Sequence, residues 1–392
     1  MVTRQHIFSH LGIRQFRRLR EVEVEVRPLT VLIGANGAGK TSFLDVWALL
    51  AESAAGRLQE YLAARGGVAE ILTRDKQDVA ADGPKPLRLD LAMTVPKFEP
   101  LVYHVTLTPA GSAYLISEEE LSQAKAGKDA FKHITSRGHN IRYFDSSAKA
   151  LLRPTWEHSP METSLSQVPK MFKEPELFRK ELASSTYYGP LNVLPQAPVR
   201  LPQPLRPADL PGRSGEDLVS CLFSMREGDR ERFEMVEDAL RAAFPDFERL
   251  DFPPVAAGVL SMTWKDKCFC RPMYMSQLSE GTLRYLWLTT LLSASKLPAV
   301  TLIDEPEVSL HPELLSHLAE LMREVSRRTQ LVVATHSDRL IRFLEPREVL
   351  ICDLEAGEAR LQWADQLDLD RWLKEYTLDQ VWQMGQMGGR AQ

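Results

Sequence analysis

The chain has 392 residues, of which 44% are hydrophobic and 26% are charged, and its formal net charge is −5. These values exclude a disordered or fibrous chain and a uniformly basic, DNA-coating protein. Four scattered cysteines exclude a disulfide framework, and no apolar run approaches the ~18 residues of a membrane span. Since the N-terminus is polar and lacks a signal-peptide core, we expect a cytoplasmic protein with no membrane partner.

The first 50 residues predict a strand, a glycine-rich loop and a helix. Residues 22–26 alternate valine with glutamate, the pattern of a half-exposed strand. Residues 29–33 form a short apolar run that is typical of a buried strand. Glycines follow, and residues 42–50 then have apolar residues at helical spacing.

The middle of the chain gives a weaker pattern. Residues 85–117 alternate in polarity and predict an antiparallel meander. Residues 118–180 are charged and irregular, which suggests an inserted arm with short helical patches. Residues 186–188 favour a strand, and residues 190–211, with seven prolines, predict an exposed and mobile connection.

The C-terminal half predicts alternating helices and strands. Helices are expected at 215–244, 278–293 and 312–327, with a strand-rich piece at 250–264 and buried strands at 300–303 and 331–334.

The loop after the apolar run at 29–33 fits the phosphate-binding pattern G-x-x-x-x-G-K-[ST]. Glycines let backbone N–H groups turn toward phosphate oxygens, and the helix N-terminus adds partial positive charge. Lys40 is expected to reach the β- and γ-phosphates and Thr41 to ligate Mg²⁺. The candidate nucleotide-binding residues are Gly34, Ala35, Asn36, Gly37, Ala38, Gly39, Lys40, Thr41 and Ser42.

Polar residues directly follow both buried strands of the C-terminal half. Asp304 and Glu305 follow the first, as a Mg²⁺ ligand and a general base for water, respectively. His336 follows the second and is a candidate to contact the γ-phosphate or to orient that water. Carboxyl ends of parallel strands meet at one crevice, so these side chains are expected to face the phosphate loop.

Ser279 and Gly281 precede the helix at 278–293. The serine can be an ordinary helix N-cap, or it can act with the glycine as a second phosphate clamp. The residues alone leave both interpretations open.

The order of these motifs resembles the ABC-type ATPases of the SMC and RecF group, and most closely the stand-alone ATPases near the OLD family. The motifs that carry the resemblance are Gly34 to Thr41 (Walker A), Leu278 to Gly281 (signature), Leu302 to Glu305 (Walker B), Ser309 to His311 (D-loop) and His336 (switch histidine). Residues 13–17 are similar to the opening strand of that group, which implies a nucleotide contact for Arg14. The signature departs from Leu-Ser-Gly-Gly-Gln at Glu280 and Thr282, and Gln77 is a weak candidate for the Q-loop glutamine.

The resemblance implies an α/β P-loop fold of ABC-ATPase type. It would have a mixed central sheet with helices, an antiparallel β subdomain and an inserted helical arm. The expected units are an N-terminal ATPase lobe (1–117), an insertion with the proline-rich connection (118–214), a C-terminal ATPase lobe (215–363) and a helical tail (364–392).

The implied activity is ATP hydrolysis with Mg²⁺, catalysed by Lys40, Glu305 and His336. In such a mechanism, Ser279 and Gly281 of one subunit close over ATP held by another, so that ATP drives dimerisation. We expect this switch to act with a separate effector or nuclease protein, in DNA repair or in anti-phage defence. In the arm, basic residues with aromatic residues between them are candidates for contact with DNA or RNA, although a solvated arm explains them slightly better. They are Lys125, Lys128, Lys132, Arg137 and Arg142, with Phe131, Tyr143 and Phe144.

Three alternatives remain less well supported. An OLD-like nuclease needs a further domain, but only 56 residues follow His336, and the aspartates at 365–370 fit a solvated face better. A chromosome-organising SMC protein needs heptad repeats, which the sequence lacks. A transporter ATPase subunit is disfavoured by the long insertion and the divergent signature.

Overall fold

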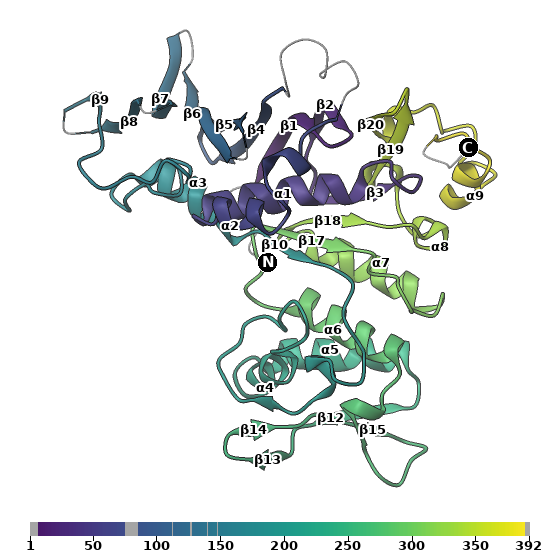
Figure 1. The fold of residues 1–392 in the computed structure, drawn as a ribbon. Helices are drawn as coiled ribbons and strands as arrows, with labels where there is room; N and C mark the ends of the chain where they lie inside the picture. Colours follow the sequence, from purple (N-terminus) through teal and green to yellow (C-terminus); the bar gives the residue numbers. More distant parts are fainter. Residues whose placement is uncertain are drawn as a thin grey trace.

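The computed structural model describes residues 7–74, 85–111, 113–125, 128–138, 140–146 and 148–388 (Figure 1). At its centre lies a six-stranded sheet in the order β10-β17-β18-β3-β19-β20. The first five strands are parallel, and β20 pairs antiparallel at the edge. The strands are β3 (Leu29–Ile33), β10 (Thr186–Tyr188), β17 (Val300–Asp304), β18 (Gln330–Ala334), β19 (Val349–Glu355) and β20 (Glu358–Trp363).

The central sheet is buried on both faces, which explains why its strands are nearly continuous apolar runs. In β3, Val31 and Ile33 pack into the core below the sheet, whereas Leu32 packs into the core above it. Successive side chains of a strand point to opposite faces, so each strand contributes to both cores.

A second sheet of eight strands is antiparallel, in the order β2-β1-β4-β5-β6-β7-β8-β9. It contains the predicted meander and continues through most of the insertion. Its strands are β1 (Phe8–Phe16), β2 (Leu19–Glu25), β4 (Leu87–Val95), β5 (Phe98–Ala110), β6 (Ala113–Lys125), β7 (Lys128–Arg137), β8 (Asn140–Asp145) and β9 (Ala150–Leu152).

The α/β fold with an antiparallel subdomain agrees with the expectation, but the helical arm needs correction. Residues 118–125, 128–137, 140–145 and 150–152 belong to strands, and helix α3 (Lys173–Ser184) comes only after them. The register between β6 and β7 shifts twice, once between Leu121 and Ser122. Such bulges interrupt the alternation of buried and exposed residues that identifies a strand. The expected boundary at 117/118 lies inside β6.

Helix α1 (Lys40–Ala54) lies between the two sheets (Figure 1). Its Trp47 is fully buried and packs edge-on against Phe8 of β1, with ring centroids 5.6 Å apart. The predicted apolar face is therefore real, and the helix is covered on both sides. The short helix α2 (Leu58–Ala63) follows it.

Below the central sheet lies a lower lobe of helices and two small sheets. Its helices are α4 (Leu218–Gly228), α5 (Arg230–Ala243), α6 (Glu280–Ser293) and α7 (Leu314–Val325). The expected helix at 215–244 is thus two helices, because Asp229 caps α5 by accepting the N–H of Arg232. The sheet strands are β11 (Gln203–Pro204), β13 (Pro254–Ala256) and β14 (Val259–Leu260) in one, with β12 (Phe247–Asp251), β15 (Thr263–Asp266) and β16 (Met273–Tyr274) in the other.

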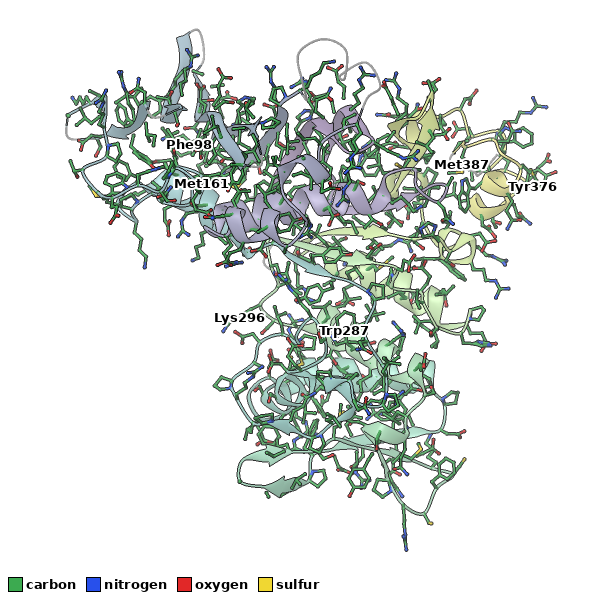
Figure 2. The ribbon with its side chains drawn as sticks, in the orientation of Figure 1. Phe98, Met161, Trp287, Lys296, Tyr376 and Met387 are labelled. Atoms are coloured by element: carbon green, nitrogen blue, oxygen red, sulfur yellow. The ribbon has the colours of Figure 1, made fainter. Side chains whose placement is uncertain are left out.

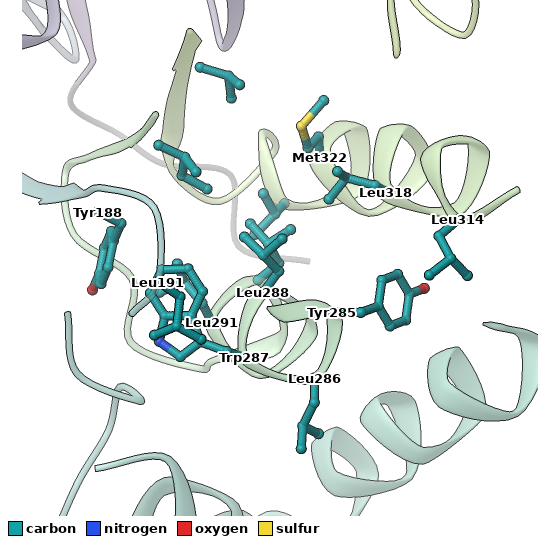
Figure 3. Close-up of a cluster of buried hydrophobic side chains, with 14 of the residues drawn as sticks. Tyr188, Leu191, Tyr285, Leu286, Trp287, Leu288, Leu291, Leu314, Leu318 and Met322 are labelled. Carbon is teal, nitrogen blue, oxygen red and sulfur yellow. The ribbon is translucent and has the colours of Figure 1, made fainter. Parts of the chain in front are cut away.

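The proline-rich connection is mostly exposed, as expected, but part of it is anchored in the core of the lower lobe. Leu191 and Val199 are buried in the core of the lower lobe. Trp287 of α6, which Figure 2 labels in this lobe, donates its indole N–H to Gly212 O at 2.9 Å. Figure 3 shows Leu191 beside Trp287 of α6, whereas Leu288 of the same helix points toward α7, which carries Leu318 and Met322. The prolines limit regular structure to the short elements η2 (Pro198–Arg200) and β11, and they do not prevent burial.

The remaining described elements are short. Helix α8 (Asp338–Ile341) follows His336, and α9 (Leu378–Gln383) packs near it. Five 3-10 turns complete the list: η1 (Val68–Glu70), η2 (Pro198–Arg200), η3 (Met275–Gln277), η4 (Pro346–Glu348) and η5 (Ala364–Gln366). Within the described ranges, no helix has the length and apolar content needed to cross a membrane.

Candidate nucleotide-binding site

The glycine-rich loop joins β3 to α1, as predicted. Gly34 has a φ of 149°, and a Cβ there would lie 2.0 Å from the carbonyl oxygen of Cys352. Gly37 and Gly39 also have positive φ, 75° and 115°. Residues with a side chain rarely adopt these backbone conformations, so the loop requires glycine at these positions. Gly39 offers no side chain to cap α1, which leaves the first N–H groups of the helix available to an anion.

The side chain of Lys40 is buried inside this loop. Its Nζ donates hydrogen bonds to the carbonyl oxygens of Gly34 at 2.6 Å and Ala35 at 3.0 Å. Burial lowers the pKa of Lys40, and nearby acidic groups, among them Asp304 and Glu305, oppose this shift. The loop therefore holds a cation that faces carboxylates.

Those carboxylates follow β17. Asp304 accepts a hydrogen bond at Oδ2 from the hydroxyl of Tyr187, on the neighbouring β10, at 2.9 Å. Burial raises the pKa of Asp304, although this hydrogen bond opposes the shift. Glu305 has a φ of 51°, and its N–H donates to Ala334 O of β18 at 2.8 Å. A non-glycine residue in the left-handed region is uncommon and is found often at functional sites.

His336 lies beside Glu305. Its Nε2 is 3.7 Å from Glu305 Oε1, and both side chains are more than a third exposed. Partial burial lowers the pKa of His336, and the positive charge of Lys40 lowers it further. The imidazole is therefore neutral at pH 7, when it can both donate and accept a hydrogen bond.

The strand order explains why these four side chains meet. Strand β18 pairs with β17 on one side and with β3 on the other, all parallel. Their carboxyl ends thus lie at one edge of the sheet, where His336 emerges between the acids and the phosphate loop. Thr41, in the first turn of α1, is exposed, and Ser42 follows it.

The site fits a nucleotide with Mg²⁺. The glycine cradle at Gly34 leaves no room for a Cβ, and the hydroxyl of Thr41 and the carboxylate of Asp304 are the oxygen donors that Mg²⁺ prefers. Lys40 supplies the positive charge that phosphates require.

The signature residues lie apart from the phosphate loop. Ser279 caps α6 by accepting the N–H of Thr282 at 3.1 Å. Gly281 packs against the D-loop, because a Cβ there would lie 2.6 Å from Ser309 O. Helix α6 belongs to the lower lobe, whereas α1 lies above the central sheet (Figure 1).

Arg14 also lies apart. It pairs with Asp90 of β4 at 3.0 Å and with Glu23 of β2 at 2.9 Å, on the antiparallel sheet. The neighbouring Arg17 instead bonds Asp45 of α1 at 2.6 Å. The structure therefore brings Arg17, rather than Arg14, to the helix that carries the phosphate loop.

The remaining sequence-based candidates are the Q-loop glutamine and the nucleic-acid contacts of the arm. Gln77 lies outside the described residues, as do the side chains of Lys125 and Lys128. In the arm, Tyr143 is buried and donates its hydroxyl to Ser164 O at 2.7 Å, so its ring is not available for stacking on a base.

Sequence reasoning missed Tyr187 and Glu307. Tyr187 is 117 residues from Asp304 along the chain, and nothing local marks the contact. Glu307 stands two residues after Glu305, and its Oε1 accepts hydrogen bonds from the Thr335 hydroxyl at 2.6 Å and the His336 N–H at 3.0 Å. Its position among the Walker B acids was the one signal that could have identified it.

Fold and site together have the arrangement of a P-loop NTPase of ABC-ATPase type. Residues 29–342 match the family described as "AAA domain, putative AbiEii toxin, Type IV TA system", and the chain belongs to this family. Nucleotide binding, usually with Mg²⁺, is typical of such ATPases.

Similar solved structures support the same fold. An Smc head bound to the C-winged helix domain of ScpA is 13% identical, with a TM-score of 0.56, covering 91% of this chain and 97% of that one. An Smc head with an extended coiled coil, bound to the C-terminal domain of ScpA and derived from Pyrococcus furiosus, is 11% identical, with a TM-score of 0.55, covering 94% and 98%. No curated protein sequence matches the chain.

Proposed function

We propose that this protein binds and hydrolyses ATP with Mg²⁺ and uses the cycle as a dimerisation switch. The observation that carries the proposal is the convergence of Lys40, Asp304, Glu305 and His336 at the ends of three adjacent parallel strands. A buried cation beside two acids and a neutral imidazole is the combination that phosphoryl transfer to water needs.

Each residue has a role that its surroundings support. Lys40 and the N–H groups at the start of α1 hold the phosphates, while Thr41 and Asp304 hold Mg²⁺, which neutralises developing charge when bound. Glu305 accepts the proton of the attacking water as general base. His336, 3.7 Å from Glu305, orients that water or donates to the terminal phosphate.

The dimer follows from the separation of the two lobes. Ser279 and Gly281 lie on the lower lobe, and the phosphate loop of the same chain lies above the central sheet. We propose that they close over ATP held by the Lys40 of a second copy. The departures from the common signature at Glu280 and Thr282 leave the serine and one glycine for this contact.

The test is molar mass by light scattering at micromolar protein, without nucleotide, with ADP and with ATP–Mg²⁺. Glu305→Gln should block hydrolysis and give a dimer with ATP only. The matched variant Ser279→Arg keeps its own phosphate loop, so it should bind a fluorescent ATP analogue normally and yet stay monomeric. A Glu305→Gln protein that remains monomeric with saturating ATP contradicts the switch.

We further propose that the dimer acts through a separate effector or nuclease protein, with DNA or RNA as ligand, in DNA repair or anti-phage defence. Phosphate release measured with added duplex DNA, single-stranded DNA and RNA tests the nucleic-acid part. We expect at least one of them to raise ATP turnover, and equal turnover with all three and with none contradicts it.

A further inference from the structure

The buried carboxylate of Glu307 joins the loops that follow β17 and β18. Its Oε1 accepts the hydroxyl of Thr335 at 2.6 Å and the backbone N–H of His336 at 3.0 Å. In the opposite direction, the N–H of Glu305 donates to Ala334 O at 2.8 Å. The loop that carries the general base and the loop that carries the histidine are thus tied together in both directions.

This arrangement is costly for stability. The second oxygen of Glu307, Oε2, is buried, and no donor among the described residues reaches it. Burial raises the pKa of Glu307, although hydrogen bonds from the Thr335 hydroxyl and from the backbone N–H groups of Glu307 and His336 oppose this shift. A buried polar atom without a partner costs about 1–3 kcal/mol. An apolar residue would avoid this cost, but it would leave the Thr335 hydroxyl and the His336 N–H without their acceptor.

A second buried glutamate shows the contrast. Glu119 lies in the core of the antiparallel sheet, and both of its oxygens have partners. They accept the N–H groups of Ser164 at 2.6 Å and Leu165 at 2.8 Å, and the hydroxyl of Tyr103 at 2.9 Å. Glu119 therefore has the bonding of a structural residue, whereas Glu307 directs its bonds to the residues beside the catalytic histidine.

We propose, relying on the ATP hydrolysis proposed above, that Glu307 is a positioning residue that fixes His336 relative to Glu305. By holding the His336 N–H and the Thr335 side chain, it fixes the backbone from which the imidazole extends. In this role Glu307 acts through Thr335 and His336 and not on the nucleotide itself. Misplacement of a catalytic group by about 1 Å can cost on the order of 100-fold in rate.

The experiment compares Glu307→Ala and Glu307→Gln with the control Glu119→Ala. Alanine removes the acceptor, so kcat should fall about 100-fold while the affinity for a fluorescent ATP analogue stays within about threefold. Glutamine keeps an acceptor oxygen for Thr335 and His336, so it should restore kcat to within about tenfold of the wild type. Glu119→Ala should lower the unfolding temperature but leave kcat of the folded protein unchanged.

The outcomes separate the inference from the proposed function. A wild type that binds but does not hydrolyse ATP removes the proposed function, and the inference with it. An active wild type and an equally active Glu307→Ala variant overturn the inference alone. A Glu307→Gln variant as inactive as Glu307→Ala also overturns it, since the charge rather than the acceptor would then matter.

If Glu307→Ala does not fold, the variant Thr335→Val tests the positioning role in its place. It removes one of the two donors to Glu307 and keeps the His336 N–H. A loss of kcat without a loss of ATP affinity supports the positioning role, and an unchanged kcat overturns it.

Discussion

Polar side chains have different hydrogen-bonding surroundings in the two sheets of this protein. In the antiparallel sheet, buried Glu119 has a partner for each oxygen, and Arg14 on the outer face pairs with Asp90 and Glu23. At the end of the central sheet, Lys40 is buried among loop carbonyls and Glu307 has an oxygen without a donor. The first arrangement stabilises a fold, whereas the second holds charged groups ready for a ligand.

The difference arises from strand direction. All five parallel strands of the central sheet end at one edge, so their terminal polar residues gather there. Antiparallel neighbours end at opposite edges, so their polar residues are spread over one exposed face and pair across strands. Substitutions at the first kind of position should therefore change activity, and substitutions at the second should change stability.

The largest expected effect is that of Lys40→Ala. The variant lacks the cation that holds the phosphates, so ATP hydrolysis should fall by at least about 100-fold. Its unfolding free energy should stay within about 1 kcal/mol of the wild type, because a buried charge that opposes folding is also removed. Phosphate release and urea unfolding measure the two quantities. Hydrolysis within threefold of the wild type would contradict the role of the loop.

Glu119→Ala should give the converse result. Three buried donors, on Ser164, Leu165 and Tyr103, lose their acceptor, and the unfolding free energy should fall by about 3 kcal/mol or more. Tyr103→Phe loses only one hydrogen bond and should cost about 1 kcal/mol. Urea unfolding followed by circular dichroism measures both. A smaller loss of unfolding free energy for Glu119→Ala than for Tyr103→Phe would contradict the structural role assigned to Glu119 in the antiparallel sheet.

A pH profile sharpens the contrast at His336. Because partial burial and Lys40 lower its pKa, the imidazole becomes charged only below the ordinary histidine value of about 6.5. If neutral His336 is required, kcat should be level at neutral pH and fall about tenfold per pH unit below a midpoint under 6.5. His336→Gln should have a lower kcat at neutral pH, and its kcat should not show this fall at acidic pH. A midpoint above 6.5 would contradict the charge environment of the site.

The smallest expected effect is that of Arg14→Ala. Its side chain is 37% exposed, and exposed ion pairs contribute about 1 kcal/mol or less. ATP affinity should not change, since its partners Glu23 and Asp90 lie on the antiparallel sheet. A tenfold weaker affinity for a fluorescent ATP analogue would instead restore the sequence-based expectation that Arg14 contacts the nucleotide. Arg17→Ala, which removes one of the two arginines that pair with Asp45 of α1, is the matched comparison.

Local patterns were sufficient for much of the core. The loop from Gly34 to Thr41 and the apolar strand before it were predictable because a phosphate loop is contiguous and its glycines are required by backbone geometry. Buried strands β17 and β18 were predictable because both faces are covered and the runs are continuously apolar. The acids and the histidine directly after them could therefore be assigned to one edge.

The arm was not predictable in the same way. Its strands have one buried face, and register shifts displace that face along β6 and β7. A charged segment with an interrupted alternation looks irregular, so strands were read as short helices. The proline-rich connection is mostly exposed, and the burial of its Leu191 and Val199 was not predictable, because no periodic pattern marks buried positions between prolines.

The sequence by itself determined the class of site, because the chemistry of phosphate binding lies in a few contiguous residues and in residue types at strand ends. Only the tertiary structure decided which side chains act together. Tyr187 meets Asp304 across 117 residues, Glu307 reaches Thr335 across 28, and Arg14 is held by carboxylates on neighbouring strands of its own antiparallel sheet. Such contacts depend on strand order and register, which no local pattern encodes.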